Sequence, residues 1–152
     1  MSRAWGIAAA TAFMVQAPAP AAERAAPTQM VTGFLRAFAA KDVDRVQSYL
    51  TDDAVLTMQV APDAPTVLRG RAAVSAYLGA VFARYARIEI GDVVTTPGAD
   101  GRTMVVEAKG TYHLADGAAH SVAYVWIVSV AGNRIVASRN YTLALPAAVT
   151  AP

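Results

Sequence analysis

The sequence predicts an α+β domain in which three N-terminal helices pack on a strongly curved, mostly antiparallel sheet, giving a cone-shaped fold. In the first half of the chain, apolar residues recur at helical spacing. The second half contains long runs rich in Val, Ile, Tyr and Thr, separated by short turns. Helices that precede a series of meandering strands are typical of α+β domains. The length of 152 residues suits one domain with its own core.

The first residues have the three parts of a secretory signal peptide. Arg3 supplies the positive start, residues 4–15 form an uncharged apolar run, and Ala19-Pro20-Ala21 fits the small-x-small rule for cleavage. The run is too short to span a bilayer comfortably, so we expect no stable membrane anchor after cleavage. The sequence therefore predicts an exported protein, periplasmic or secreted, with a signal peptide (1–21), a linker (22–27), a domain (28–146) and a flexible tail (147–152).

Three helices are expected before the long strands. Thr28 can cap the first, and Asp42 can cap a shorter second helix. The third is expected to begin at Gly70. The apolar stripes of the first and third helices consist of Val31, Phe34, Leu35 and Phe38, and of Val74, Tyr77, Leu78, Val81, Phe82 and Tyr85.

Six strands are expected between and after the helices. Residues 51–54 form a turn signal, so the first strand is expected only from Val55 to Val60. A second short strand covers residues 66–69. Four longer strands follow, at 87–95, at 102–114, and in the two runs of a hairpin that spans 119–145 and turns at Ala131-Gly132-Asn133.

The last hairpin is apolar on both of its faces. Alternation places on one face His120, Val122, Tyr124, Trp126, Val128, Val136, Ser138, Asn140 and Thr142. The other face receives Ala123, Val125, Ile127, Ile135, Ala137, Arg139, Tyr141 and Leu143. A hairpin with one face in water does not fit this pattern. We expect the first face to line a cavity and the second, convex face to form a homodimer interface, the alternative cover being the linker or the tail.

Three short segments carry a resemblance to a known superfamily. They are Ala40-Lys41-Asp42-Val43-Asp44, Leu50-Thr51-Asp52-Asp53-Ala54 and Arg69-Gly70-Arg71-Ala72-Ala73-Val74. Together with residues 135–141, they resemble the nuclear-transport-factor-two-like superfamily, which includes SnoaL-like polyketide cyclases and ketosteroid isomerases. The resemblance covers about residues 29–145 and implies the cone-shaped fold. It does not fix the function, because this fold hosts enzymes, binding proteins and assembly domains.

The resemblance does not extend to the catalytic residues of ketosteroid isomerases. Phe34 stands at the position of their oxyanion-hole tyrosine, Met58 at that of the general base, and Trp126 at that of the second, acidic oxyanion donor. A methionine cannot accept the proton, and a phenylalanine cannot donate to an oxyanion. Ketosteroid isomerase activity is therefore not expected.

Aromatic and small polar side chains share the predicted cavity face. The expected pocket consists of Phe34, Met58, Tyr77, Tyr112, Tyr124, Trp126, Ser138 and Asn140. Such a wall suits a small, mostly apolar ligand, although the aromatic residues could equally be core. Polar residues that follow one another on an inward face must form hydrogen bonds with water, with a ligand or with each other.

Three functions of different class stay open. The first is an exported protein that binds a small apolar molecule without catalysis. The second is an isomerase, cyclase or lyase of SnoaL type that uses His120 with Asn140 or Tyr112, although His120 could simply be a solvated residue at a strand end. The third is an assembly or interaction subunit. Whether the protein is an enzyme is thus not decided by the sequence.

Charge and composition argue against several other classes. The formal net charge is +2 and no basic stripe occurs, so nucleic-acid binding is not expected. The chain has no cysteine, and its His, Asp and Glu residues have no metal-ligand spacing. We expect no metal and no cofactor.

Overall fold

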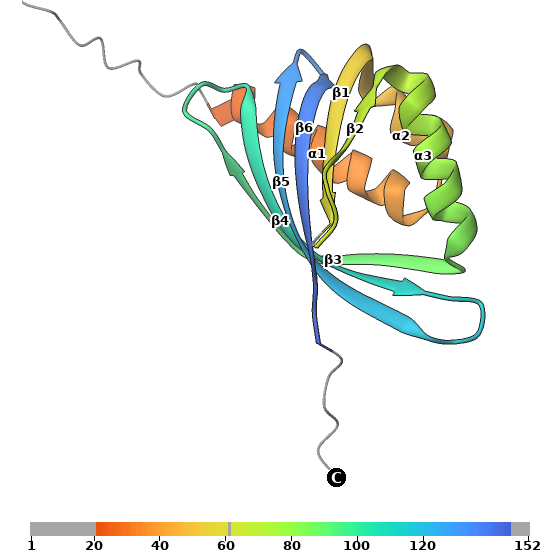
Figure 1. Ribbon diagram of the computed structural model, residues 1–152. Coiled ribbons are helices and arrows are strands. Elements are labelled where there is room, and N and C mark those ends of the chain that lie inside the picture. Colours follow the sequence, from red (N-terminus) through yellow and green to blue (C-terminus); the bar gives the residue numbers. More distant parts are fainter. Residues whose placement is uncertain (1–20, 61, 147–152) are drawn as a thin grey trace, which may run out of the picture.

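Three helices lie on one side of a curved sheet in the computed structural model, which describes residues 21–60 and 62–146 (Figure 1). The helices are α1 (Ala21–Ala39), α2 (Val43–Ser48) and α3 (Gly70–Arg84). The strands are β1 (Leu50–Val60), β2 (Thr66–Arg69), β3 (Arg87–Pro97), β4 (Thr103–His113), β5 (Ala119–Ala131) and β6 (Arg134–Ala144). The predicted α+β fold is confirmed. Most of the expected signal peptide, residues 1–20, and the expected tail, 147–152, lie outside the described residues.

The six strands form one sheet in the order β2-β1-β6-β5-β4-β3. The β1–β6 pair is parallel, and the other neighbouring pairs are antiparallel. A mostly antiparallel sheet was expected from the short turns between the later strands. No helix in the described part of the chain is long and apolar enough to cross a membrane.

Helix α1 begins earlier than the sequence predicted. The expected linker at 22–27 is helical, and the helix continues through Pro27. Thr28 is therefore no N-cap, and its carbonyl oxygen accepts a hydrogen bond from Thr32 Oγ1 at 2.9 Å. A proline inside a helix removes one backbone donor, but alanine, which dominates residues 21–26, has the highest helix propensity.

Strand β1 also begins earlier than predicted, because residues 51–54 are not a turn. The pairing with β6 shifts between Leu50 and Val55, so a bulge absorbs the residues between them. Ala54 is fully buried, whereas Asp52 is exposed and binds Arg71. Two acidic residues in a row indicated a turn, yet at a bulge they can reach solvent without ending the strand.

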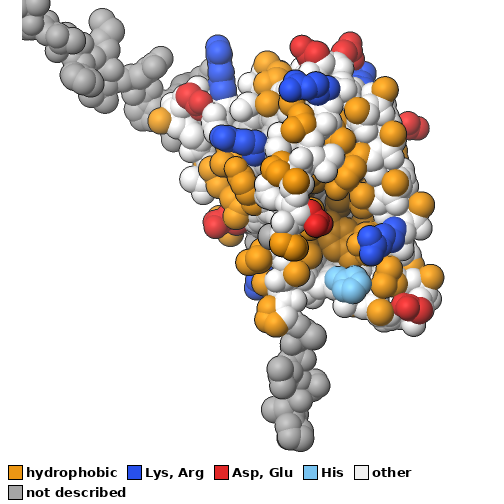
Figure 2. All heavy atoms as spheres, in the orientation of Figure 1, with side chains coloured by type: hydrophobic (Ala, Val, Ile, Leu, Met, Phe, Trp, Pro, Cys, Tyr) orange, Lys and Arg blue, Asp and Glu red, His pale blue; other side chains and the backbone are white. Residues whose placement is uncertain are grey.

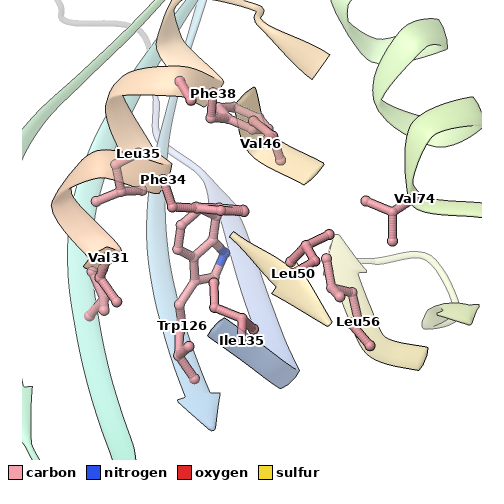
Figure 3. Packing of buried hydrophobic residues seen from close by; sticks show 14 of the residues in the cluster. Val31, Phe34, Leu35, Phe38, Val46, Leu50, Leu56, Val74, Trp126 and Ile135 are labelled. Carbon is pink, nitrogen blue, oxygen red and sulfur yellow. The ribbon is translucent and has the colours of Figure 1, made fainter. Parts of the chain in front are cut away.

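A second bulge corrects the predicted position of Ile135. The β5–β6 register passes from Ser129 opposite Ala137 to Val130 opposite Ile135, which leaves Val136 as an extra residue. Ile135 was expected on the convex face, but it is 3% exposed and belongs to the core beside the helices. Figure 3 shows its side chain near that of Trp126.

The core fills the space between α1 and the sheet. The ring of Phe34 on α1 meets that of Trp126 on β5 edge to face, with 5.4 Å between the centroids (Figure 3). Phe38 meets Phe82 of α3 in the same way at 5.2 Å. The first contact holds α1 against the sheet, and the second holds α3 against α1.

The segments that resemble the superfamily bind one another rather than the cavity. Asp42 Oδ1 accepts a hydrogen bond from the backbone N–H of Arg45 at 2.9 Å and caps α2. Arg71 donates to the carbonyl oxygen of Leu50 at 2.9 Å and forms an ion pair with Asp52 at 3.1 Å. Gly70 has φ +76°, a conformation that glycine adopts at little cost. These motifs therefore specify the fold and carry no information about the ligand.

Candidate functional site

A cavity of about 590 Å³ opens between α3 and the concave face of the sheet. Figure 2 shows a hollow lined by hydrophobic side chains, with a histidine and charged side chains near its rim. The cavity is lined by Phe38, Met58, Val60, Asp63, Ala64, Thr66, Tyr77, Ala80, Val81, Arg84, Tyr85, Tyr112, His120, Val122, Tyr124, Trp126, Asn140 and Thr142. Its size and its mostly apolar wall are those of a site for a small molecule.

A narrow void of about 30 Å³ adjoins the cavity on the core side. The two spaces share Phe38, Met58, Tyr77 and Trp126 as lining residues. Phe34 and Ser138 line the narrow void and not the large cavity. The void is large enough to hold a water molecule.

Six of the eight residues predicted to form the pocket line the large cavity. They are Met58, Tyr77, Tyr112, Tyr124, Trp126 and Asn140. The prediction missed Val81, Arg84 and Tyr85 of the third helix, whose spacing from Tyr77 places them along one side. This helical spacing could have identified them. The lining residues from the β1–β2 connection gave no recognisable signal.

Asn140 is the one polar side chain among the described residues that is almost fully buried, with 2% exposure. It lies on β6 between Met58 of β1 and Trp126 of β5, its partners in the strand registers. Its Oδ1 accepts a hydrogen bond from Thr142 Oγ1 at 2.7 Å. Its Nδ2 finds no acceptor in the described part of the chain, and neither does Trp126 Nε1. The wall of the cavity therefore contains two neighbouring residues with unpaired buried donors.

Two tyrosines form a hydrogen-bonded pair in the same wall. The hydroxyl groups of Tyr112 on β4 and Tyr124 on β5 are joined by a short hydrogen bond. Burial raises the pKa of Tyr112 to about 12. The pKa of Tyr124 is raised further, mainly by burial and secondly by the nearby Tyr112 hydroxyl. Both phenols are neutral at physiological pH. Whichever of them donates to the other, one hydroxyl proton stays available for a ligand.

The acidic, basic and histidine lining residues, Asp63, Arg84 and His120, are exposed at the rim. The guanidinium carbon of Arg84 lies 5.6 Å from the ring centroid of Tyr85, a cation–π contact that holds it there. His120 lies opposite Tyr112 in the β4–β5 register. Two of the three predicted catalytic candidates, His120 and Tyr112, are thus neighbours, and the third, Asn140, lies in the buried wall of the same cavity.

No group of three or more His, Asp or Glu side chains suited to a metal occurs among the residues that the structure describes. The polar groups of the inner wall are phenols, an indole, an amide and hydroxyls. These groups can orient a ligand by hydrogen bonds, and the phenols or His120 could move a proton.

The fold and its cavity define a cone-shaped α+β protein of the nuclear-transport-factor-two-like superfamily. The family model for the SnoaL-like domain matches residues 31–138, so the chain belongs to the family of SnoaL-like domains. A search among curated proteins finds no match.

Several solved structures share the fold. A candidate isomerase from Bacillus subtilis has a TM-score of 0.69 at 18% identity, with 80% of this chain and 88% of that chain covered. A candidate polyketide cyclase from Xanthomonas campestris pv. campestris has a TM-score of 0.64 at 23% identity, with coverage of 78% and 91%. An LEH-like epoxide hydrolase from M. tuberculosis has a TM-score of 0.63 at 22% identity, with coverage of 78% and 84%. At these identities the likeness shows the fold alone.

Proposed function

We propose that this SnoaL-like protein binds a small, mostly apolar ligand in the cavity between α3 and the sheet. The observation that carries the proposal is the wall itself: a space of about 590 Å³ with aromatic and aliphatic sides and few polar groups. A core that served only for stability would be packed without a space of this size. Residues 1–21 support export of the protein to the periplasm or the medium.

A neutral fluorescent probe, N-phenyl-1-naphthylamine, tests this proposal. Its emission should rise with saturation at one probe per chain. Val122, which lines the cavity and is partly buried, is the residue to change. Val122→Trp should remove the signal, whereas Val94→Trp, at an exposed position on β3, should not. A signal that does not saturate, or that survives Val122→Trp in a folded protein, contradicts the proposal.

A second candidate function is acid–base catalysis by an isomerase, cyclase or lyase. One observation favours it: His120 lies opposite Tyr112, which is hydrogen-bonded to Tyr124. A histidine at the rim could take a proton from a bound molecule while a neutral phenol donates to its oxygen. Among the structural neighbours, one is named as a candidate polyketide cyclase and another as an LEH-like epoxide hydrolase.

Proton exchange distinguishes catalysis from binding. Phenylacetone incubated with the protein in D₂O should exchange its α-protons faster than in buffer if His120 acts as a base, and NMR follows the loss of signal. His120→Gln should then abolish the exchange while keeping the affinity for N-phenyl-1-naphthylamine. Exchange at the buffer rate leaves binding without catalysis as the function.

The export proposal has its own test. N-terminal sequencing of the protein from the periplasm or medium should show a mature chain that begins near Ala22. Recovery from the cytoplasm of a chain that begins at Met1 or Ser2 would contradict export.

A further inference from the structure

The charged side chains of the cavity are gathered at its rim, while its inner wall is uncharged. Arg84 and His120 are exposed, and so is Asp63, the one acidic side chain among the described lining residues. The inner wall carries aromatic, aliphatic and neutral polar side chains. A charged group placed against this wall would lose its hydration without gaining a buried partner of opposite charge. A ligand with one charged group therefore binds with that group at the rim and its apolar part inside.

Arg84 and His120 lie on the same side of the mouth, with two tyrosine rings between them. The guanidinium carbon of Arg84 is 5.6 Å from the ring centroid of Tyr85, and this centroid is 4.7 Å from that of Tyr112. Tyr112 is opposite His120 in the β4–β5 register, so these two side chains project from the same face of the sheet. Figure 2 shows a histidine and a basic side chain near each other beside the hollow. The two groups therefore border one stretch of the rim.

Neither group is engaged in holding the fold together. Within the part of the chain that the structure describes, the side chains of Arg84 and His120 form no ion pair and no hydrogen bond. Asp63 comes from the β1–β2 connection, and the sheet order separates β1 from β5 by β6. The contact with Tyr85 already restricts the guanidinium of Arg84, so less side-chain entropy is lost when an anion binds to it.

A carboxylate matches this stretch of the rim. The planar guanidinium presents its N–H groups in a fork that fits the two oxygens of a carboxylate. The imidazole of His120 has an N–H donor even when it is neutral. A cationic head group would be repelled by Arg84, and a neutral head group would gain no ionic attraction.

We propose that the cavity binds an apolar carboxylic acid with its head group outward, Arg84 forming an ion pair with the carboxylate and His120 donating a hydrogen bond to it. The hydrocarbon body lies among the tyrosine rings of the cavity. This inference rests on the proposed function and adds the class of ligand and its direction.

Three probes with the same ten-carbon chain and different head groups test the inference. Decanoate is negative, decan-1-ol is neutral and decylammonium is positive at about pH 8. Each is titrated against the complex of the protein with N-phenyl-1-naphthylamine, and the loss of dye emission gives its affinity. Because the chain is constant, an effect that changes sign with the head group reports charge recognition at the rim.

Arg84→Met removes the charge and keeps an unbranched side chain. It should lower the affinity for decanoate about fivefold, equivalent to about 1 kcal/mol, as for an exposed ion pair. The affinity for decan-1-ol should stay nearly the same, and that for decylammonium should rise. Arg84→Lys keeps the charge and should retain most of the affinity for decanoate.

Arg45→Met is the matched control. The guanidinium carbon of Arg45 lies 5.8 Å from the ring centroid of Tyr49, so this exposed arginine makes the same kind of contact as Arg84 but does not line the cavity. The substitution should change none of the three affinities. Thermal unfolding shows that each variant is folded before its affinities are compared.

NMR locates the head group. The chain has two histidines, His113 and His120, so the imidazole C–H signals of His120 are those that His120→Gln removes. Decanoate should shift these signals, and decan-1-ol should shift them much less. Raising the salt to about 0.5 M should weaken the binding of decanoate and not that of decan-1-ol, because salt screens charges exposed at a rim.

The outcomes separate this inference from the proposed function. If Arg84→Met leaves the affinity for decanoate unchanged, or lowers all three affinities equally, the carboxylate inference is overturned. The same holds if decanoate leaves the signals of His120 where they are. In each of these cases, saturable binding of the dye still upholds the proposed function. If neither the dye nor any of the three probes binds, the proposed function fails and the inference fails with it.

Discussion

The ammonium nitrogen of Lys41 donates a hydrogen bond to the backbone carbonyl oxygen of Tyr85 across 2.8 Å. It also lies 3.4 Å from the carbonyl oxygen of Phe82. Both carbonyls belong to the C-terminal end of α3, which leaves its last acceptors unpaired within the helix. A residue between α1 and α2 therefore caps the helix that forms one side of the cavity.

Replacing this lysine should destabilise the fold without touching the cavity wall. Lys41→Met keeps most of the aliphatic stem and should lower the free energy of unfolding by about 1–2 kcal/mol, because charged hydrogen bonds to partly buried carbonyls are lost. Urea denaturation measures the change. Lys109→Met is the control, since Lys109 is 65% exposed and pairs with Asp92 on the surface. It should change stability by less than about 0.5 kcal/mol, and an equal effect of both variants would refute the cap.

Gly110 makes room for the tyrosine pair, and this predicts a second effect. A Cβ atom at Gly110 would lie 2.7 Å from Tyr124 Cε2 and from its hydroxyl oxygen. Gly110→Ala should therefore push the ring aside, separate it from Tyr112 and destabilise the protein by about 1–3 kcal/mol. The affinity for N-phenyl-1-naphthylamine should fall at the same time.

Gly91→Ala provides the matched control on β3, because no atom lies within 4 Å of a Cβ atom built there. It should leave stability unchanged or raise it slightly through a less flexible unfolded chain. A Gly110→Ala protein with normal stability and dye affinity would show that Tyr124 is not held where the structure places it.

The buried phenols predict a loss of stability at alkaline pH. Burial raises the pKa of Tyr112 to about 12 in the folded protein, against 10.0 for an unperturbed tyrosine. Above pH 10 the unfolded chain therefore releases protons that the folded chain retains. Stability from this group is complete below pH 10 and is lost as the pH rises towards 12.

Tyr112→Phe removes one of the retained protons. The free energy of unfolding, measured by urea denaturation between about pH 8 and about pH 11, should fall less steeply in this variant than in the wild type. Absorbance of the phenolate in the folded protein gives an independent measure of the titration. A slope unaffected by the substitution would contradict the buried position of the Tyr112 hydroxyl.

The alternation of residues along the strands predicted correctly which side chains of β5 face the core, but it gave the wrong face where a bulge adds a residue. Tyr124, Trp126 and Val128 are buried as alternation required. Ile135 is not where alternation put it, because one extra residue at Val136 reverses the faces before that point. A bulge depends on pairing with a distant strand, which a run of β-branched residues does not reveal.

The site was predictable only in part for a related reason. The alternating residues of β5 and β6 identified Trp126 and Asn140, because the two strands pair without a register shift from Val122 opposite Ala144 to Ser129 opposite Ala137. Arg84 and the β1–β2 connection enter the cavity through the packing of α3 and the path of a loop, which are tertiary features. The orientation of the Asn140 amide depends on its hydrogen bond with Thr142, two residues away. The sequence does not reveal this hydrogen bond, whereas the structure does.

The convex face of the sheet supports the last prediction, a homodimer. Val125, Tyr141 and Leu143 lie on this face of β5 and β6, and their exposed fractions are 39%, 44% and 59%. Val125 is opposite Tyr141 in the register, so these side chains are contiguous across the two strands. Together with their neighbours they form an apolar patch on the order of several hundred Å², near the upper limit for a soluble monomer.

A second copy of the same patch is the simplest cover, because a two-fold axis makes one surface complementary to itself. The exposed Arg139 lies within the patch and would need an acceptor across the interface. We expect a dimer in analytical ultracentrifugation at micromolar concentration. Val125→Asp should dissociate it, because a carboxylate would be buried without a partner, whereas Val94→Asp, at an exposed valine of β3, should not. A wild-type monomer under these conditions would contradict the dimer, and the face would then be covered by the chain's own tail or by a different partner. A dimer that tolerates Val125→Asp would place the interface on another surface.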